Sequence, residues 1–250
     1  MSIIIALYIT LIGLIMGSFY NVVASRIPVG ESIVHPPSHC SGCGTKLKAR
    51  DLIPLLSYVA SKGRCRYCGM RLSWLYPASE AMTGLLFLWI FNLKEITTES
   101  LIGFTLVSMG IIVSVADMIY MRIPNKILMF FAPLFIILVI IWPAHSLWSH
   151  GLGAIAGGGI LVLIVLITGA MGIGDVKLFA LCGWCIGLPN TLLALLLACA
   201  IGTLVGGGLM LTGQVKRGQP ISFGPFLMIG TLIAYGYGSE IIGGYLSLIG

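Results

Sequence analysis

Residues 127–174, ILMFFAPLFIILVIIWPAHSLWSHGLGAIAGGGILVLIVLITGAMGIG, contain no Asp, Glu, Lys or Arg. A helix needs about 20 apolar residues to cross a bilayer, so this stretch is long enough for two spanning helices. The polar segment Pro143–His150 lies within it and predicts the connection between them. This stretch therefore indicates a helical membrane protein.

The composition of the whole chain has the same character. Of the 250 residues, 58% are hydrophobic and 9% are charged, against about 25% charged residues in an ordinary soluble domain. The mean hydropathy is +1.05. A soluble protein of this size has too little interior to cover so much apolar surface. The composition therefore excludes the soluble, disordered and nucleic-acid-binding classes.

Other uncharged runs raise the expected number of spanning helices to eight. Pro189 and Asn190 divide the run 178–215 into two helices, and a shorter helix is predicted at about 77–93. The runs that hold one helix each are 1–25, 100–116 and 218–239. No Lys or Arg precedes Arg26, whereas a cleaved signal peptide begins with a positive region. We therefore expect the first run to remain as a helix.

The basic residues predict the orientation in the membrane. With the N-terminus outside, the segments 26–76, 117–126, 172–177 and 213–223 lie on the inner side and hold 13 of the 14 Lys and Arg residues. Only Lys94 lies outside. Basic residues strongly favour cytoplasmic loops, so we expect the four segments to face the cytosol. The net charge of +6 then needs no nucleic-acid partner.

The first inner segment contains two Cys-x-x-Cys-Gly sequences, at 40–44 and 65–69. Each such turn presents two sulfurs to one ion, the glycine allows a tight backbone, and two turns complete a tetrahedral four-thiolate zinc site. The alternative is a pair of disulfides, which the reducing cytosol disfavours. The predicted metal ligands are Cys40, Cys43, Cys65 and Cys68.

The predicted fold class is therefore an all-α polytopic membrane protein with about eight transmembrane helices and a small cytosolic zinc-knuckle-like loop domain. The expected domains are a first transmembrane helix at 1–25, a cysteine loop domain at 26–76 and a seven-helix transmembrane domain at 77–250. His39 adjoins Cys40, and we interpret it as an exposed loop histidine rather than a ligand.

Two aspartates, Asp117 and Asp175, fall at the inner ends of predicted spanning helices. Ionisable side chains at membrane depth are costly and usually functional. Two carboxyl groups that meet in a low-dielectric site share a proton, so one can activate water while the other protonates a scissile carbonyl oxygen. That is the chemistry of aspartyl proteases. The alternative is that each aspartate pairs locally, with Arg122 or Lys177, and the spacing alone does not separate these hypotheses.

Several motifs resemble those of one family. Gly172-Ile-Gly-Asp175 matches the GxGD signature of intramembrane aspartyl proteases, and Val-Lys177 extends it as in type IV prepilin peptidases. The other matching segments, in order, are GSFYNVVASRIP (17–28), HPPSHC (35–40) and the cysteine segment up to Cys68, YPASE (76–80) and PISFGPF (220–226). The chain is similar to this family along essentially its whole length. One departure is Asn125 after Pro124, where many members have Asp.

The resemblance implies a bifunctional enzyme of the bacterial inner membrane, in type IV pilus assembly or protein secretion. As an aspartic endopeptidase it would cleave the short basic leader of prepilins and pseudopilins at the cytosolic face, with Asp117 and Asp175 as the catalytic pair. As an N-methyltransferase it would then methylate the new N-terminus, using S-adenosylmethionine.

Glu80 has two interpretations. We expect it in the first turn of a helix that begins near Pro77, where the helix dipole favours an acidic side chain. The resemblance instead links it to methyl transfer, where it would bind the cationic cofactor or the substrate amine.

Two other functions stay open at this point: a peptidase without methyltransferase activity, and a transporter with Asp117 and Asp175 as a proton relay. Relay carboxylates usually lie near the bilayer midplane, between internal repeats. The two aspartates instead lie at helix ends, and no repeat is visible.

Overall fold

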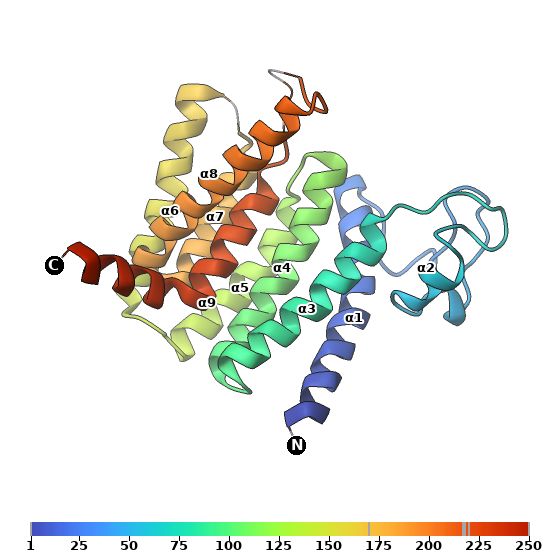
Figure 1. The fold of residues 1–250 in the computed structure, drawn as a ribbon, viewed down its shortest axis with the longest axis horizontal. Helices are drawn as coiled ribbons and strands as arrows, with labels where there is room; N and C mark the ends of the chain where they lie inside the picture. Colours follow the sequence, from blue (N-terminus) through green and yellow to red (C-terminus); the bar gives the residue numbers. More distant parts are fainter. Residues whose placement is uncertain (1, 170, 217–218, 220, 250) are drawn as a thin grey trace. The chain divides into compact units, whose positions relative to one another are not determined.

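The computed structural model describes residues 2–169, 171–216, 219 and 221–249 (Figure 1). This part of the chain is helical and contains no β-strand beyond isolated bridges. Its α-helices are α1 (Ser2–Arg26), α2 (Leu56–Ala60), α3 (Leu75–Lys94), α4 (Thr98–Tyr120), α5 (Asn125–Ile141), α6 (Leu147–Thr168), α7 (Ile173–Ile186), α8 (Leu188–Leu211) and α9 (Gly224–Ile249). Two short 3₁₀ turns, Ile27–Val29 and Ala49–Asp51, lie between α1 and α2.

Five of these helices, α1, α4, α6, α8 and α9, are long and apolar enough to cross a membrane. The expected all-α, multi-pass membrane class is therefore confirmed. Helix α5 is apolar but has 17 residues, and α7 has 14, which is about 21 Å of helix against a hydrocarbon core of about 30 Å. The count of eight spans stays a prediction.

The helices break close to the predicted polar segments. Helix α5 ends at Ile141 and α6 begins at Leu147, so His150 belongs to α6 and not to the connection. Gly187 separates α7 from α8 with a φ of +75°, a conformation that favours glycine. Pro189 then lies in the first turn of α8, where its missing N–H breaks no helical hydrogen bond.

The chain forms two compact units, residues 1–100 and 101–250. In the first unit α1 packs along α3 at glycine contacts: a Cβ on Gly13 would lie 2.8 Å from the Cα of Gly84, so only glycine fits there. In the second unit α6 packs on α7, α8 packs on α9, and α7 also contacts α5 and α9. The domain boundaries at 25 and 76 stay a prediction.

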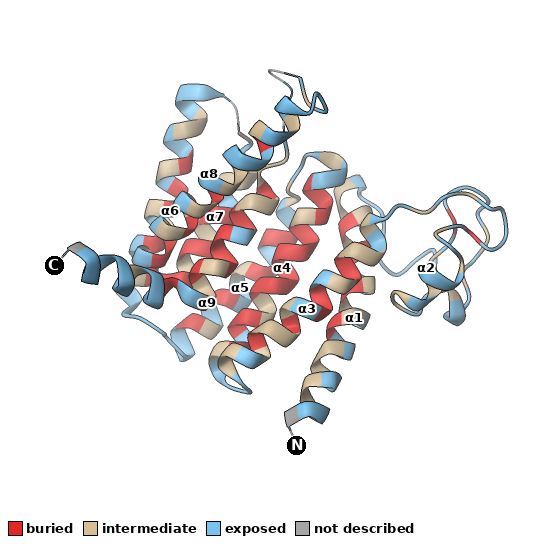
Figure 2. Cartoon of the chain, viewed as in Figure 1, coloured by how far each residue is buried: buried red, intermediate tan, exposed pale blue. Residues whose placement is uncertain are grey.

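Burial follows the packing (Figure 2). Helix α4 is buried along most of its length, whereas α2 and the loops around it are largely exposed. The region between α1 and α3 therefore lacks an apolar core of its own, and specific polar and sulfur contacts must hold it together.

Candidate functional site

The two Cys-x-x-Cys-Gly turns have the same backbone form. The N–H of Gly44 donates to the carbonyl of Cys40 at 2.8 Å, and the N–H of Gly69 donates to the carbonyl of Cys65 at 2.9 Å. Both glycines are left-handed, with φ of +68° and +74°. The expected role of the glycines in tightening each turn is confirmed.

The four thiols of these turns form one cluster. Their Sγ atoms all lie within 4.8 Å of one another, and those of Cys40 and Cys68 are 3.8 Å apart. A tetrahedral zinc ion with Zn–S bonds of about 2.3 Å would place its sulfurs about 3.8 Å apart. All seven cysteines are free thiols, so the disulfide alternative is not what the structure contains. The donor set fits a closed four-thiolate metal site.

The thiols of the cluster differ in acidity. Hydrogen bonding to the Thr45 hydroxyl, 3.2 Å away, lowers the pKa of Cys43 to about 6. A hydrogen bond from the Met70 N–H lowers the pKa of Cys68, but desolvation and the neighbouring cysteines outweigh it and raise that pKa to about 11. Four crowded thiols do not all ionise alone, and a bound divalent cation would stabilise the thiolates.

Asp51 connects the segments that carry the two turns. Its Oδ2 accepts hydrogen bonds from the Lys48 N–H at 3.1 Å and from the Tyr67 hydroxyl at 2.9 Å, and its Oδ1 lies 3.4 Å from Nε of Arg66. Desolvation raises the pKa of Asp51, but these donors and the nearby arginines outweigh it and hold the pKa below its usual 3.8. No sequence pattern indicated this role.

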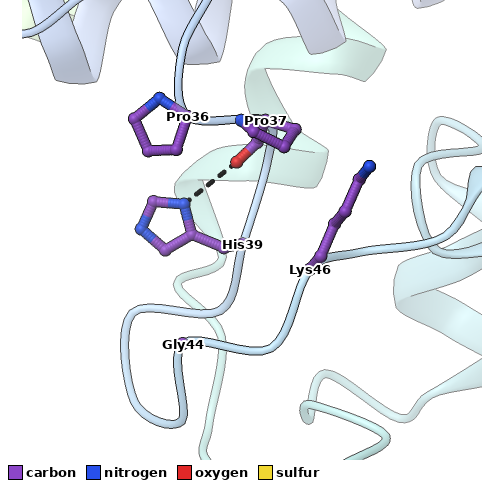
Figure 3. Close-up of a pocket in the computed structure, with 5 residues that line it drawn as sticks. All are labelled: Pro36, Pro37, His39, Gly44 and Lys46. Carbon is purple, nitrogen blue, oxygen red and sulfur yellow. Dashed lines mark hydrogen bonds between the residues drawn. The ribbon is translucent and has the colours of Figure 1, made fainter.

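His39 lies outside the thiol cluster. Its ring is turned toward the carbonyl of Pro37, with 3.0 Å between Nδ1 and the oxygen (Figure 3). Together with Pro36, Gly44 and Lys46 it lines a solvent-exposed hollow in the loop. The interpretation of His39 as an exposed loop histidine is confirmed.

Glu80 lies in the second turn of α3, because the helix begins at Leu75, two residues before Pro77. The expected first-turn position is therefore wrong, and the helix dipole acts on Glu80 less than predicted. The side chain is buried, and its Oε2 accepts a hydrogen bond from the Leu55 N–H at 2.9 Å. Leu55 has a φ of +60°, uncommon for a residue other than glycine. Glu80 thus holds the backbone at the start of α2.

Asp117 lies near the end of α4, and 6% of the residue is exposed. Its Oδ2 accepts two hydrogen bonds, from the Ser222 hydroxyl at 2.5 Å and from the Gly224 N–H at 3.0 Å. Gly224 is the first residue of α9, and the first N–H groups of a helix have no partner inside that helix. The first residue of α9 and the segment just before it therefore supply the two donors.

Asp175 lies in the first turn of α7. Its Oδ2 accepts a hydrogen bond from the Gly172 N–H at 3.2 Å, so the side chain caps its own helix. Its Oδ1 is buried and has no hydrogen-bond partner within the described residues. Buried polar atoms are nearly always hydrogen-bonded, and an exception in a native structure is often functional.

The connection between α4 and α5 brings the two aspartates together. A Cβ on Gly174 would lie 2.9 Å from the Cβ of Ile123, and one on Gly224 would lie 3.5 Å from the Cδ1 of Ile123. Ile123 therefore packs against the starts of both α7 and α9. The carboxyl groups are close enough for the charge of Asp117 to act on Asp175.

The local ion pairs that the sequence left open are not present in the described part of the chain. Neither Asp117 nor Asp175 forms an ion pair there. Lys177 instead donates from Nζ to the Asn125 side-chain oxygen at 3.0 Å. Lys177 therefore links the start of α7 to the start of α5 and does not neutralise its neighbour Asp175.

Ser222 and Gly224 are the contacts that sequence reasoning did not assign. The segment PISFGPF at 220–226 stood out only as a matching motif before an uncharged run, with no indication of what it touches. The available signal was a small polar residue, Ser222, two positions before a Gly-Pro pair at the start of a helix. The partner, Asp117, is 105 residues away from Ser222.

Fold and site together define a class: a multi-pass helical membrane protein with a carboxyl pair at helix ends and a cluster of four cysteine thiols in a loop. The chain belongs to the type IV leader peptidase family. The model of that family matches residues 104–207, and the model described as the bacterial peptidase A24 N-terminal domain matches residues 11–93.

Three relatives illustrate how far the similarity extends, and all are named prepilin leader peptidase/N-methyltransferase. The protein from Bacillus subtilis (strain 168) is 40% identical, over 94% of this chain and 96% of its own. The Pseudomonas putida protein is 31% identical over 96% and 93%, and the Aeromonas hydrophila protein 30% identical over 95% and 92%. No solved structure matches the chain.

Proposed function

We propose that the chain is a prepilin leader peptidase and N-methyltransferase of the bacterial inner membrane. The observation that carries this proposal is the 40% identity to a relative with that name over nearly the full length of both chains. The aligned region includes the thiol cluster and both aspartates, so neither half of the bifunctional assignment depends on a partial match.

In the cleavage reaction Asp117 and Asp175 are the catalytic pair and share one proton. The ionised carboxylate removes a proton from water, whose oxygen attacks the carbonyl carbon of the scissile peptide bond, while the other carboxyl protonates the carbonyl oxygen. Collapse of the tetrahedral intermediate breaks the C–N bond, and the leaving amine takes up a proton. The electrostatic coupling of the two carboxyls supports this assignment.

Cys40, Cys43, Cys65 and Cys68 would hold a structural zinc ion. Four thiolates leave the metal no open coordination position, so its contribution is to the stability of the loop and not to either reaction. The fit of the sulfur spacing to tetrahedral coordination supports this part of the proposal.

For methyl transfer, S-adenosylmethionine would supply the methyl group that the free amine of the cut pilin accepts. Glu80 is the proposed residue for the cationic cofactor or the amine. Its carboxylate already accepts a hydrogen bond from the Leu55 N–H. Binding the cofactor or the amine would therefore be a second role, in addition to stabilising the loop.

We also propose that the N-terminus lies outside and that the thiol cluster and the aspartate pair face the cytosol. The 13-to-1 distribution of basic residues supports this orientation. Cys43 and Cys68 are exposed, so a membrane-impermeant thiol reagent is expected to label residues 40–68 only after permeabilisation and metal removal. Labelling of these residues in intact cells, detected by peptide mapping, would show that the protein has the opposite orientation.

The test of the function is incubation of the purified full-length protein with a prepilin and labelled S-adenosylmethionine, with cleavage and methylation scored together. Both products are expected. Cleavage without methylation would indicate a peptidase that lacks methyltransferase activity. Neither product, from a correctly inserted protein, would reject the proposal and favour the proton-relay transporter.

A further inference from the structure

The two carboxyl groups receive unequal numbers of hydrogen bonds. Asp117 receives two hydrogen bonds on a single oxygen, one from the Ser222 hydroxyl and one from the Gly224 N–H. Asp175 receives one hydrogen bond, from the Gly172 N–H, and its other oxygen is buried without a partner among the described residues. The surroundings therefore distinguish two side chains that are chemically identical.

We propose that Ser222 and Gly224 are positioning residues that hold Asp117 as the ionised, water-activating member of the pair and leave the shared proton on Asp175. The inference rests on the proposed peptidase function and extends it by dividing the roles within the catalytic pair.

Hydrogen-bond donors select the charged form of a carboxyl group. Bonds to an ionised acceptor are shorter and about twice as strong as neutral ones, and two donors on one oxygen of Asp117 favour its carboxylate. A buried oxygen without a donor is costly when its group is charged. Oδ1 of Asp175 is such an atom, so Asp175 is the member that keeps the proton.

The structure also explains why residue 224 is a glycine. A Cβ at this position would lie 2.8 Å from Oδ2 of Asp117, a distance that real Cβ atoms essentially never show. No positive φ is involved, so the glycine is needed for close approach and not for an unusual backbone conformation. Without a side chain at residue 224, the backbone N–H can reach the carboxylate.

Other charged groups near the pair do not supply these donors. On the neighbouring elements they are Asp175 and Lys177 on α7, Arg122 in the loop before α5, Lys126 on α5, and Lys216 in the segment that precedes Ser222. Lys177 is bonded to Asn125. The only charged residue of α9 is Glu240, 16 residues beyond Gly224 and so about 24 Å along the helix.

The first test is Ser222→Ala in the purified full-length protein, assayed for prepilin cleavage across a range of pH. Losing one bond to a charged group is expected to lower kcat about 10- to 100-fold, with KM unchanged. With fewer donors the carboxylate is easier to protonate, so the acid limb of the pH–rate profile should move to higher pH. Ser222→Thr keeps the hydroxyl and should restore both kcat and the profile.

The matched control is Ser247→Ala. Ser247 lies near the far end of α9, is exposed, and within the described residues donates its hydroxyl to the Gly244 carbonyl of its own turn. This variant should cleave like the unaltered protein.

The second test is Gly224→Ala, which keeps both donors but adds the Cβ that would displace the carboxylate. A fall in kcat of similar size is expected, again with KM unchanged. Gly243→Ala is its control, because a Cβ at Gly243 on the same helix meets nothing within 4 Å. Should Ser222→Ala fail to fold, judged by thermal unfolding and by methylation of a pilin cut beforehand, Gly224→Ala carries the test alone.

The outcomes separate this inference from the function on which it rests. Unchanged kcat and pH profile in folded Ser222→Ala, beside an inactive Asp117→Asn, would remove the positioning role and leave the peptidase in place. A shift of the basic limb instead of the acid limb would make Asp117 the proton donor and overturn the division of roles. Cleavage by Asp117→Asn itself would remove Asp117 from the catalytic pair and overturn the inference, whereas absence of cleavage by the unaltered protein would reject the peptidase assignment.

Discussion

The thiol cluster and the aspartate pair are assembled in opposite ways. All four cysteines lie between residues 40 and 68, and they come from two copies of one turn with the same backbone form. The aspartate pair instead needs α4, α7 and α9, and Asp117 finds its donors 105 and 107 residues further along the chain. The first site is a property of a local motif, and the second is a property of helix packing.

This difference predicts that the two sites fail independently. The cysteines belong to the compact unit 1–100, and the aspartates belong to the unit 101–250. Damage to the loop should therefore leave the carboxyl chemistry largely intact, and neutral substitutions of the aspartates should leave the metal content unchanged. The following predictions test that independence, from the largest expected effect to the smallest.

Asp117→Asn or Asp175→Asn should each reduce prepilin cleavage by a factor of about 10² to 10⁴ or more, because each removes a carboxyl needed for proton transfer. Asparagine keeps a similar size and polarity, so protein level, membrane insertion and metal content should stay near normal. The measurement is cleavage by purified protein alongside metal analysis. Substantial residual cleavage in either variant would favour a structural role for that aspartate.

Substitution of Cys40, Cys43, Cys65 or Cys68 by Ser should lower the zinc content from about one ion per chain toward none, because three thiolates do not complete the site. The loop should lose stability before cleavage is affected. Elemental analysis with limited proteolysis measures both effects. Cys199→Ser, an exposed cysteine of α8 outside the cluster, is the control. A zinc-free preparation with full activity and an intact loop would remove the metal from the proposal.

Substitutions in the two compact units should affect methylation and cleavage differently. Asp175→Asn should still methylate a pilin that was cut beforehand, since methyl transfer does not need the carboxyl pair. Glu80→Gln should depress methylation about 10-fold while cleavage changes less, because it removes one charge near the amine or the cofactor. Single-turnover assays on cut and uncut pilin distinguish these effects.

Two substitutions at residue 80 test the structural alternative. Glutamine keeps an oxygen that can accept the Leu55 N–H, whereas Glu80→Ala loses both the charge and the acceptor. If Glu80 serves only to hold the loop, Glu80→Gln should behave like the unaltered protein and Glu80→Ala should not. If Asp175→Asn stops methylation of pre-cut pilin with the fold intact, cleavage and methyl transfer share a single site.

The smallest effect is expected from Asp51→Asn, which weakens the links between the two cysteine turns. Zinc affinity, measured against a competing chelator at neutral pH, should fall about 10-fold, as for other residues that orient metal ligands indirectly. The pKa of Asp51 is held below its usual 3.8, so its contribution is complete above that pH and is lost only as the pH falls further. Glu31→Gln, at an exposed position in the same loop, should not change the affinity.

The sequence alone determined the class of the protein and the chemistry of its local site. Long uncharged runs can be stable only as membrane helices, whatever the details of their packing. The paired cysteine turns are similarly self-contained, because the backbone bonds and the left-handed glycines that shape each turn lie within a few residues. The sequence also predicted that Asp117 and Asp175 lie at the same depth, since helix ends follow from where the uncharged runs stop.

Only the tertiary structure decided which groups surround each carboxyl. The contacts of Asp117 with Ser222 and Gly224 depend on how closely α4, α7 and α9 approach one another, which no periodicity in the sequence encodes. The hydrogen bond from the Leu55 N–H to Glu80 likewise joins residues that are 25 positions apart in the chain. A hydrogen bond depends on distances of a few tenths of an ångström, and packed side chains set those distances.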